Sequence, residues 1–334
     1  MNRTLAVPLL CLLALTASRC TASRPSPEAS PLRVVVISDL NSAYGSTTYE
    51  PRVSRTIDRI REVWRPDLVL AAGDMIAGQQ PSLSDQRVEA MWEAFDAVVG
   101  APLRDAGIPF APTIGNHDGS RYPAHARDRE LAERHWRHPR HRPALRFIDS
   151  ADFPFNYSFV HEGLFVLVWD ASNEEIARSD DQLRWVEQAL SSPQARGAGM
   201  RIVLGHLPLY AVAEGRNRPG EVLAQPDSLR SLLERHRVHT YVSGHHHAYY
   251  PGRRGQLELL HTGALGQGPR PLIGSNEEPF PSVTLLEIWP ARDSASWTTY
   301  RISEDGTQIE HVADTRLPTR IDGFNGHVVR RDLR

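Results

Sequence analysis

Short apolar, β-branched runs alternate with segments of helical periodicity along most of this 334-residue sequence. Runs typical of buried strands occur at 33–38, 68–72, 108–114, 164–169, 201–204 and 240–243, and helical spacing occurs at 52–64, 84–99, 182–190 and 228–236. Such alternation predicts βαβ units and an α/β fold. Beyond residue 250 the pattern changes to strands with few helices, at 257–261, 283–289 and 297–302, which we expect to complete a second sheet.

Polar residues stand at the ends of the predicted strands. They occur in five motifs: Asp39-Leu40-Asn41, Gly73-Asp74, Gly115-Asn116-His117-Asp118, Gly205-His206 and Gly244-His245-His246-His247. In α/β sheets, ligands bind beyond the carboxyl ends of the strands, so we expect these side chains to meet there. Imidazole nitrogen together with carboxylate and amide oxygen suits metals such as Zn, Mn, Fe or Co. The sequence therefore predicts a metal centre.

The order of these motifs resembles the calcineurin-like metallophosphoesterase superfamily, over residues from about 33 to 290. Two further features are similar to the purple acid phosphatases of that superfamily: Asp181-Gln182-Leu183-Arg184-Trp185 at the start of a predicted helix, and Tyr249-Tyr250 after the histidine cluster. The resemblance implies two packed mixed β-sheets flanked by helices, arranged as a four-layer α/β sandwich.

The resemblance also implies a ligand set for two divalent or trivalent metal ions, drawn from Mn, Fe, Zn and Co. Asp74 is expected to bridge the two ions, and His246 to be a spacer that does not ligate. The remaining ligands divide between a first ion, held by Asp39, Asn41 and His247, and a second ion, held by Asn116, His206 and His245.

Two positions depart from the family pattern. Asn41 stands where the superfamily usually has histidine, and an amide oxygen is a weaker and harder ligand than imidazole. The first site is therefore expected to favour Mn or Mg, to bind its ion loosely, or to hold a water molecule at this position. Ala77 stands where purple acid phosphatases have a tyrosine ligand, so we expect no tyrosinate–iron colour.

The chemistry expected of such a centre is hydrolysis of a small phosphate ester. Two metal ions can generate a bridging hydroxide for in-line attack on phosphorus. The resemblance implies that His117 donates a proton to the leaving group and that Asp118 orients His117. We favour phosphomonoesters as substrates. A phosphodiesterase on the same metal core is one alternative, and a non-catalytic metal-binding scaffold, supported only by Asn41, is another.

An Arg- and His-rich insertion interrupts the pattern at 119–146, with eight arginines and four histidines. It is either a surface helix with paired charges or a cap whose arginines attract an anionic substrate. A cap would favour the dianionic group of a phosphomonoester. Arg270, in a glycine-rich loop at 263–270, is a further candidate phosphate contact. The formal net charge of −2 gives no general attraction to nucleic acid, so no specific nucleic-acid partner is expected.

The two ends of the chain differ in character from the expected catalytic domain at 33–305. Residues 1–20 contain a short apolar run followed by small residues and predict a signal peptide, with a Pro/Ser-rich linker at 21–32. We therefore expect export to the periplasm or the extracellular space, and no transmembrane segment. Cys20 resembles a lipoprotein acylation site, although Arg19 departs from that motif, so a lipid-anchored protein is an alternative. Residues 306–334 are weakly patterned and are expected to form a separate C-terminal tail.

Overall fold

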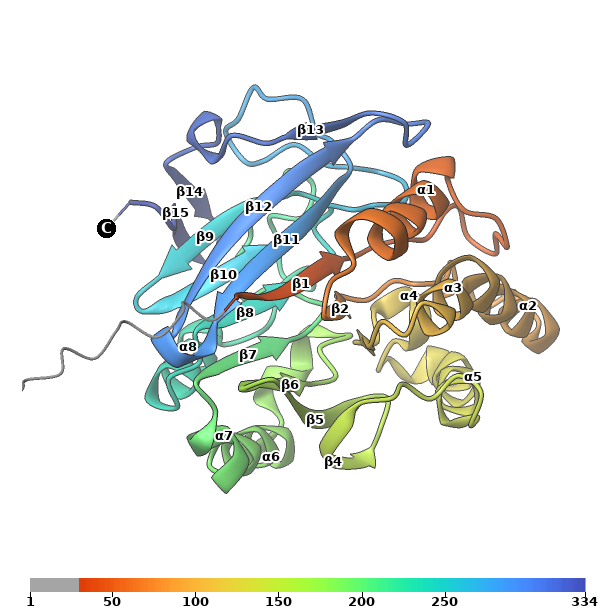
Figure 1. The fold of residues 1–334 in the computed structure, drawn as a ribbon, viewed down its shortest axis with the longest axis horizontal. Helices are drawn as coiled ribbons and strands as arrows, with labels where there is room; N and C mark the ends of the chain where they lie inside the picture. The colour runs from red at the N-terminus through yellow and green to blue at the C-terminus, as the bar shows by residue number, and fades with distance from the viewer. Residues whose placement is uncertain (1–29, 334) are drawn as a thin grey trace, which may run out of the picture. The chain divides into compact units, whose positions relative to one another are not determined.

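Two mixed β-sheets, of six and nine strands, form the framework of the chain (Figure 1). The computed structural model describes residues 30–333. The expected signal peptide, residues 21–29 of the expected linker and Cys20 lie outside the described residues. Within them, the expectation of an α/β fold with two mixed sheets and flanking helices is confirmed.

The first sheet has the strand order β13-β12-β11-β1-β2-β3. Its parallel part comprises β1 (Leu32–Ile37), β2 (Leu68–Ala71) and β3 (Phe110–Pro112). Its antiparallel part comprises β11 (Ser282–Trp289), β12 (Ser294–Ile302) and β13 (Ile309–His311). Every residue of β2 is buried, which explains why its sequence is apolar throughout and does not alternate.

The second sheet has the strand order β14-β15-β9-β10-β8-β7-β6-β5-β4. Its central strands run parallel to one another: β10 (Leu257–His261), β8 (Thr240–Ser243), β7 (Met200–Leu204) and β6 (Leu164–Val168). The outer strands pair antiparallel: β9 (Tyr250–Arg254), β5 (Asn156–His161), β4 (Arg146–Asp152), β14 (Arg320–Gly323) and β15 (Gly326–Arg330).

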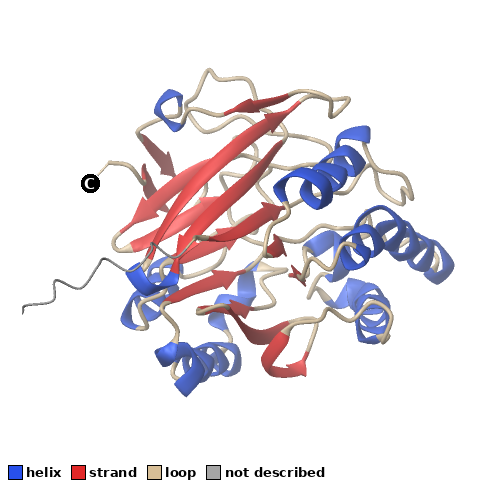
Figure 2. Ribbon diagram, viewed as in Figure 1, coloured by secondary structure: helices blue, strands red, loops and turns tan. Residues whose placement is uncertain are grey.

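Helices lie outside the strands, as Figure 2 shows. They are α1 (Pro51–Arg59), α2 (Asp85–Phe95), α3 (Ala101–Asp105), α4 (Asn116–Gly119), α5 (Ala126–Arg137), α6 (Asp180–Leu190), α7 (Pro193–Gly197) and α8 (Pro226–Arg235). Helices α1 and α2 continue into π-helical segments at Ile60–Trp64 and Asp96–Gly100, and short 3-10 segments occupy Pro123–His125, Glu174–Arg178, Pro290–Arg292 and Asp314–Arg316. The four helices expected from periodicity are confirmed. Among residues 30–333, no helix combines the length and the apolar character needed to cross a bilayer.

The C-terminal third differs from the expectation in two ways. The strands beyond residue 250 divide between the sheets, because β11 and β12 join the first sheet while β10 joins the second. Residues 306–334 also contribute β13, β14 and β15, and β15 pairs with β9. This segment is therefore part of both sheets and not a separate tail.

The contribution of the C-terminal strands to stability can be tested at their buried contact. Ile321 on β14 pairs with Val328 on β15, and both side chains are fully buried. We expect Ile321→Ala to lower the free energy of unfolding by about 2–4 kcal/mol, measured by urea denaturation, because the truncation leaves a cavity. Phe324→Ala, in the exposed turn between these strands, should change it by less than about 0.5 kcal/mol. Equal, small effects would contradict a role for this segment in the core.

Candidate metal centre

The candidate metal centre lies where the carboxyl ends of strands from both sheets come together. Each predicted ligand follows a parallel strand, so the chain leaves the sheet at the residue that faces the centre. The first sheet supplies Asp39, Asp74 and Asn116 after β1, β2 and β3, and the second sheet supplies His206, His245 and His247 after β7 and β8. The centre therefore forms only when both sheets are folded and packed.

Two groups of side chains at this place could each hold a metal ion. The first group is Asp74, His206 and His245, and the second is Asp39, Asp74 and His247. Within each group, the three ligand atoms, one from each residue, lie within 4.8 Å of one another. Asp74 belongs to both groups, as expected of a bridging carboxylate. The structure thus brings these five predicted ligands together.

The distances between ligand atoms suit a shared ion. His206 Nε2 lies 3.3 Å from Asp74 Oδ2 and 3.0 Å from Asn116 Oδ1. In the other group, His247 Nε2 lies 3.2 Å from Asp39 Oδ1. Metal–ligand bonds of about 2.0–2.2 Å place two ligands at right angles on one ion roughly 3 Å apart. The nitrogen and oxygen donors present therefore fit a divalent metal.

Four of these residues have left-handed backbone conformations. The φ angles are 49° at Asp39, 54° at Asp74, 64° at His245 and 53° at His247. A residue other than glycine rarely adopts a positive φ, and such residues concentrate at functional sites where the surroundings impose the conformation. The strained backbone conformations therefore occur at residues whose side chains point toward the centre.

The glycines that precede the ligands allow the backbone segments to approach closely. A Cβ atom on Gly115 would overlap the backbone N and the carboxylate of Asp74. A Cβ atom on Gly244 would overlap Ser38 Oγ and the carboxylate of Asp39. The Gly-Asn and Gly-His pairs in the sequence are thus needed for packing, because a side chain at Gly115 would displace the carboxylate of Asp74 and one at Gly244 would displace that of Asp39.

Asp74 and His206 stabilise each other's charged forms. Burial raises the pKa of the Asp74 carboxyl, but His206 and then His117 outweigh burial and hold this pKa well below its ordinary value. Burial lowers the pKa of His206, but the Asp74 carboxylate outweighs it and raises this pKa to about 9. Ligation requires neutral imidazole, so a metal ion at these atoms replaces the proton that His206 otherwise shares with Asp74.

The other ligands have different electrostatic surroundings. Burial raises the pKa of Asp39, but His247 outweighs burial and lowers it. Burial lowers the pKa of His245 to about 4, so its imidazole is neutral and ready to ligate. The carboxylates of both groups are therefore ionised, as metal ligation requires.

Hydrogen bonds on the outer side of the rings fix the orientation of the ligand histidines. His206 Nδ1 lies 2.8 Å from the carbonyl of Ala72, and His247 Nδ1 lies 2.9 Å from the carbonyl of Gly268. Because a carbonyl only accepts, Nδ1 carries a proton in both rings, and Nε2 is the nitrogen that faces the carboxylates and would bind a metal ion.

Glu221 is a residue of this centre that the sequence did not reveal. Its Oε2 lies 2.9 Å from His245 Nε2, and its carboxylate also pairs with Arg216 and Arg218. Its backbone carbonyl accepts a hydrogen bond from His246 Nε2 at 2.9 Å. Glu221 follows no strand and belongs to no motif, so only the folded loop between β7 and α8 shows its connection to His245.

His246 is engaged away from the centre. Its ring is fully buried, its Nε2 is bonded to the Glu221 carbonyl, and its Nδ1 accepts the backbone N–H of Val212 at 3.3 Å. Both ring nitrogens are thus used by the loop between β7 and α8. This agrees with the expectation that His246 is a spacer.

The two asparagines differ in how firmly they are held. Asn116 donates its Nδ2 to Gln79 Oε1 at 2.6 Å, which leaves Oδ1 on the side of the metal ligands. Asn41 is buried, and its backbone N–H lies 3.3 Å from the carbonyl of Asp74, but its side chain forms no hydrogen bond with any residue between 30 and 333. The ligand role of Asn41 stays a prediction.

His117 lies at the edge of the centre with one nitrogen directed toward it. Its Nδ1 is 3.1 Å from the carbonyl of Gly78, and its Nε2 is 3.9 Å from Asp74 Oδ2. Its backbone N–H donates to Asp74 Oδ1 at 2.9 Å. The exposed ring of Tyr44 lies beside it, with the ring centroids 5.1 Å apart. His117 is therefore placed to exchange a proton through Nε2.

Asp118 was expected to orient the His117 ring, but its carboxylate instead accepts hydrogen bonds from backbone N–H groups. Its Oδ1 accepts the backbone N–H groups of Met75 at 2.8 Å and Ile76 at 3.0 Å, and its Oδ2 accepts that of Gly115 at 2.9 Å. Burial, together with the charge of Asp74, raises the pKa of this carboxyl. Asp118 thus fastens the segment after Asp74 to the segment before Asn116, and the Gly78 carbonyl takes the position beside the His117 ring.

Six of the eight arginines of the 119–146 insertion are paired with acidic side chains. Arg127 pairs with Asp85, and Arg134 pairs with Glu89 on the neighbouring helix α2. At the other end of the insertion, Arg140 pairs with Asp96 at 3.4 Å. Of the two interpretations of this segment, these contacts favour the surface helix with paired charges.

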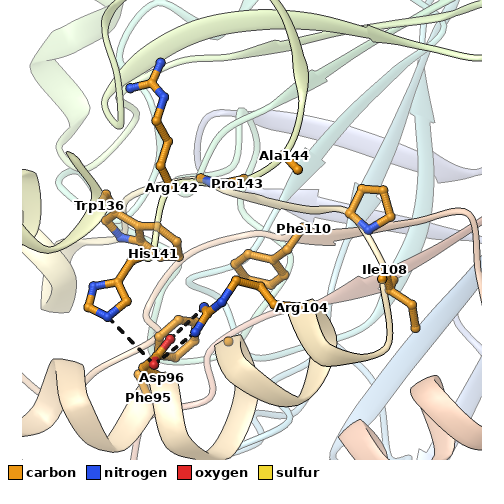
Figure 3. Close-up of a pocket in the computed structure, with 13 residues that line it drawn as sticks. Phe95, Asp96, Arg104, Ile108, Phe110, Trp136, His141, Arg142, Pro143 and Ala144 are labelled. Atoms are coloured by element: carbon orange, nitrogen blue, oxygen red, sulfur yellow. Dashed lines mark hydrogen bonds and ion pairs between the residues drawn. The ribbon is translucent and has the colours of Figure 1, made fainter. Parts of the chain in front are cut away.

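A separate pocket lies at the amino end of β3, whereas Asn116 follows its carboxyl end (Figure 3). The close-up shows Arg104 and His141 both directed at Asp96, at 2.7 and 3.7 Å, beside the rings of Phe110 and Trp136. None of the predicted metal ligands lines this pocket. Its single carboxylate is already paired with arginine, so it does not offer a second metal site.

Comparison with known proteins assigns the fold and the motifs to one family. The sequence model of the calcineurin-like phosphoesterase family matches residues 32–249. No curated protein sequence matches the chain.

Solved structures share the fold at low sequence identity. The chain is similar to purple acid phosphatase PPD1 from yellow lupin seeds, with a TM-score of 0.60 and 17% identity, over 84% of this chain and 53% of the lupin protein. It is also similar to GAP50, described as the anchor in the inner membrane complex of Plasmodium, with a TM-score of 0.51 and 13% identity, over 85% of this chain and 89% of that protein. The chain therefore spans about half the length of the purple acid phosphatase it matches.

The structural task of Asp118 can be tested by its removal. We expect Asp118→Ala to lower the free energy of unfolding by about 3 kcal/mol or more, because three buried N–H groups lose their acceptor and each costs about 1–3 kcal/mol. Denaturant titration measures the change, and Asp181→Ala, at an exposed carboxylate, is the control. A variant of Asp118 with wild-type stability but reduced turnover would instead support the role of orienting His117.

Proposed function

Because the chain belongs to the calcineurin-like phosphoesterase family of phosphoric ester hydrolases, we propose that it hydrolyses phosphate monoesters at the centre around Asp74. The observation that carries this proposal is the presence of Asp74 in both ligand groups, which is the arrangement a two-metal centre needs. Nothing outside this centre among residues 30–333 gathers so many histidine and carboxylate ligands.

We propose that two metal ions occupy the centre, drawn from Mn, Fe, Zn and Co. When bound, the pair supplies a hydroxide nucleophile and neutralises charge on the phosphoryl oxygens. Asp74, His206, His245 and Asn116 would hold one ion, and Asp39, Asp74 and His247 the other, with Asn41 nearby. The second group has fewer nitrogen donors, so it is expected to bind its ion more weakly.

His117 is the proposed proton donor to the leaving group. The hydrogen bond from Nδ1 to the Gly78 carbonyl fixes the ring and leaves Nε2 facing the centre. Proton transfer at Nε2 would neutralise the leaving alkoxide as the ester bond breaks.

The proposed preference for monoesters rests on arginines in the loops beside the centre and not on the 119–146 insertion. The arginines of the insertion are largely neutralised by acidic partners, so they give weak support. Arg216, Arg218 and Arg270 gather near the metal ligands and would attract a dianionic monoester more than a monoanionic diester. A phosphodiesterase on the same ligands is the main alternative.

A paired assay separates these activities. The protein stripped with a chelator and reloaded with Mn, Zn, Fe or Co should hydrolyse p-nitrophenyl phosphate faster than bis(p-nitrophenyl) phosphate, and the stripped protein should hydrolyse neither. Faster hydrolysis of the bis ester would favour the phosphodiesterase. Metal binding without hydrolysis of either ester would favour the non-catalytic scaffold, whose support in this sequence is Asn41.

The role of His117 is tested by an isosteric change. His117→Asn should lower kcat for p-nitrophenyl phosphate by about 10²–10⁴-fold, because general-acid catalysis contributes that much, while metal content and stability stay as in the wild type. His138→Asn, at an exposed histidine of the insertion, is the control and should have wild-type kcat. Unchanged turnover in His117→Asn would remove the acid role.

We also propose that the protein is exported, on the basis of the signal-peptide pattern in residues 1–20. Lipid attachment at Cys20 is the alternative to a free exported form. Cell fractionation of the wild type and of Cys20→Ser distinguishes them, since a lipid anchor would hold only the wild type in the membrane fraction.

A further inference from the structure

Three arginines from two loops gather beside the metal ligands. Arg216 and Arg218 lie on the loop between β7 and α8, and Arg270 lies on the loop after β10. A β-bridge between Ala213 and Leu272 joins the loops. The backbone N–H of Glu214 donates to the carbonyl of Pro271 at 2.9 Å, and the backbone N–H of Ile273 donates to the carbonyl of Val212 at 2.9 Å. The arrangement of the arginines is therefore set by backbone hydrogen bonds.

This arginine cluster, which comprises Arg216, Arg218 and Arg270, is connected directly to the centre. The backbone N–H of Arg270 donates to the carbonyl of His247 at 3.1 Å. Glu221, which pairs with Arg216 and Arg218, also contacts His245 Nε2 at 2.9 Å. Each loop thus contacts a predicted metal ligand, so an anion bound to the cluster would lie close to a phosphate held at the centre.

The cluster has hydrogen-bond donors without acceptors. The Nε atoms of Arg216 and Arg270 are buried and have no partner among the described residues. The guanidinium of Arg270 as a whole forms no hydrogen bond or ion pair with any residue between 30 and 333, whereas each arginine of the insertion that faces α2 has an acidic partner. Buried donors are normally satisfied, so these point to a ligand.

The cluster also has an excess of positive charge. Arg216 and Arg218 both pair with the single carboxylate of Glu221, which is in addition bonded to His245, and Arg270 pairs with no carboxylate among residues 30–333. Asp39 is close enough to act on Arg270, but its charge is already opposed by His247. Arginine remains charged under all ordinary conditions, so the excess persists when the metals are bound.

We propose that the arginine cluster binds a second phosphate group of the substrate, so that the protein prefers substrates carrying two phosphate groups. This inference rests on the proposed function, because the first phosphate is held by the metal centre. Guanidinium groups match phosphate oxygens with paired hydrogen bonds, and the unpartnered Nε atoms supply the donors. Arg216 is kept in place by Glu221, while Arg218, whose side chain is 70% exposed, can turn toward a ligand.

Binding of non-hydrolysable phosphonates tests the subsite apart from turnover. Isothermal titration of the metal-loaded protein with methylphosphonate, methylenediphosphonate and 1,3-propylenediphosphonate compares one anionic group with two at different spacings. We expect at least one diphosphonate to bind about tenfold or more tightly than methylphosphonate, and Arg270→Gln to reduce this preference to about twofold, as expected for loss of a charge-assisted contact. Arg218→Gln, at a largely exposed side chain, should also reduce this preference.

The matched control is Arg320→Gln, at an exposed arginine paired with Asp322, which should keep the wild-type preference. Equal affinity for all three phosphonates in the wild type would overturn the subsite. A preference that survives in both Arg270→Gln and Arg218→Gln would assign it to the metals and also overturn the subsite. Hydrolysis of p-nitrophenyl phosphate, which has one phosphate, reports separately on the proposed function, so either can fail without the other.

Discussion

The carboxylate of Asp74 is the point on which the arrangement of the centre depends. It is 1% exposed, and burying an ionised carboxylate is costly unless positive charge and hydrogen-bond donors surround it. His206, which follows a strand of the second sheet, supplies the positive charge, and the backbone N–H of His117, which follows a strand of the first sheet, supplies a hydrogen bond. The left-handed backbone, the absence of a side chain at Gly115 and the bonds made by Asp118 all keep this carboxylate in position.

The sequence predicted the features whose signals are local. Strands such as β2 and β8 are short apolar runs that end at a polar motif, and the carboxyl ends of parallel strands share one edge, so the meeting of Asp74, His206 and His245 followed from the pattern. Features that depend on distant contacts were not predictable. β4 is partly exposed along its length, β15 is defined by pairing with β9 and β14 by pairing with β15, and the contact of Glu221 with His245 exists only in the folded loop.

Charged residues near the centre are of two kinds, and composition alone does not distinguish them. In the insertion, arginine and acidic residues alternate along the sequence, and the folded helix pairs them with each other or with α2. In the loops beside His245 and His247, Arg270 stands in a glycine-rich segment that already made it a candidate phosphate contact, whereas Arg216 and Arg218 belong to no motif. Their significance comes from packing, which places Arg270 near Arg216 with too few carboxylates between them.

The division of the ligands between two sheets links metal supply to resistance against unfolding. The chain has only two cysteines, at positions 11 and 20, so no disulfide joins the sheets within residues 30–333. An ion held by Asp74 and His206 is then a removable cross-link between them. A ligand that binds only the native state stabilises it by about 2.7 kcal/mol at a concentration one hundred times its Kd. The lifetime of the folded protein would therefore follow the availability of metal in its surroundings.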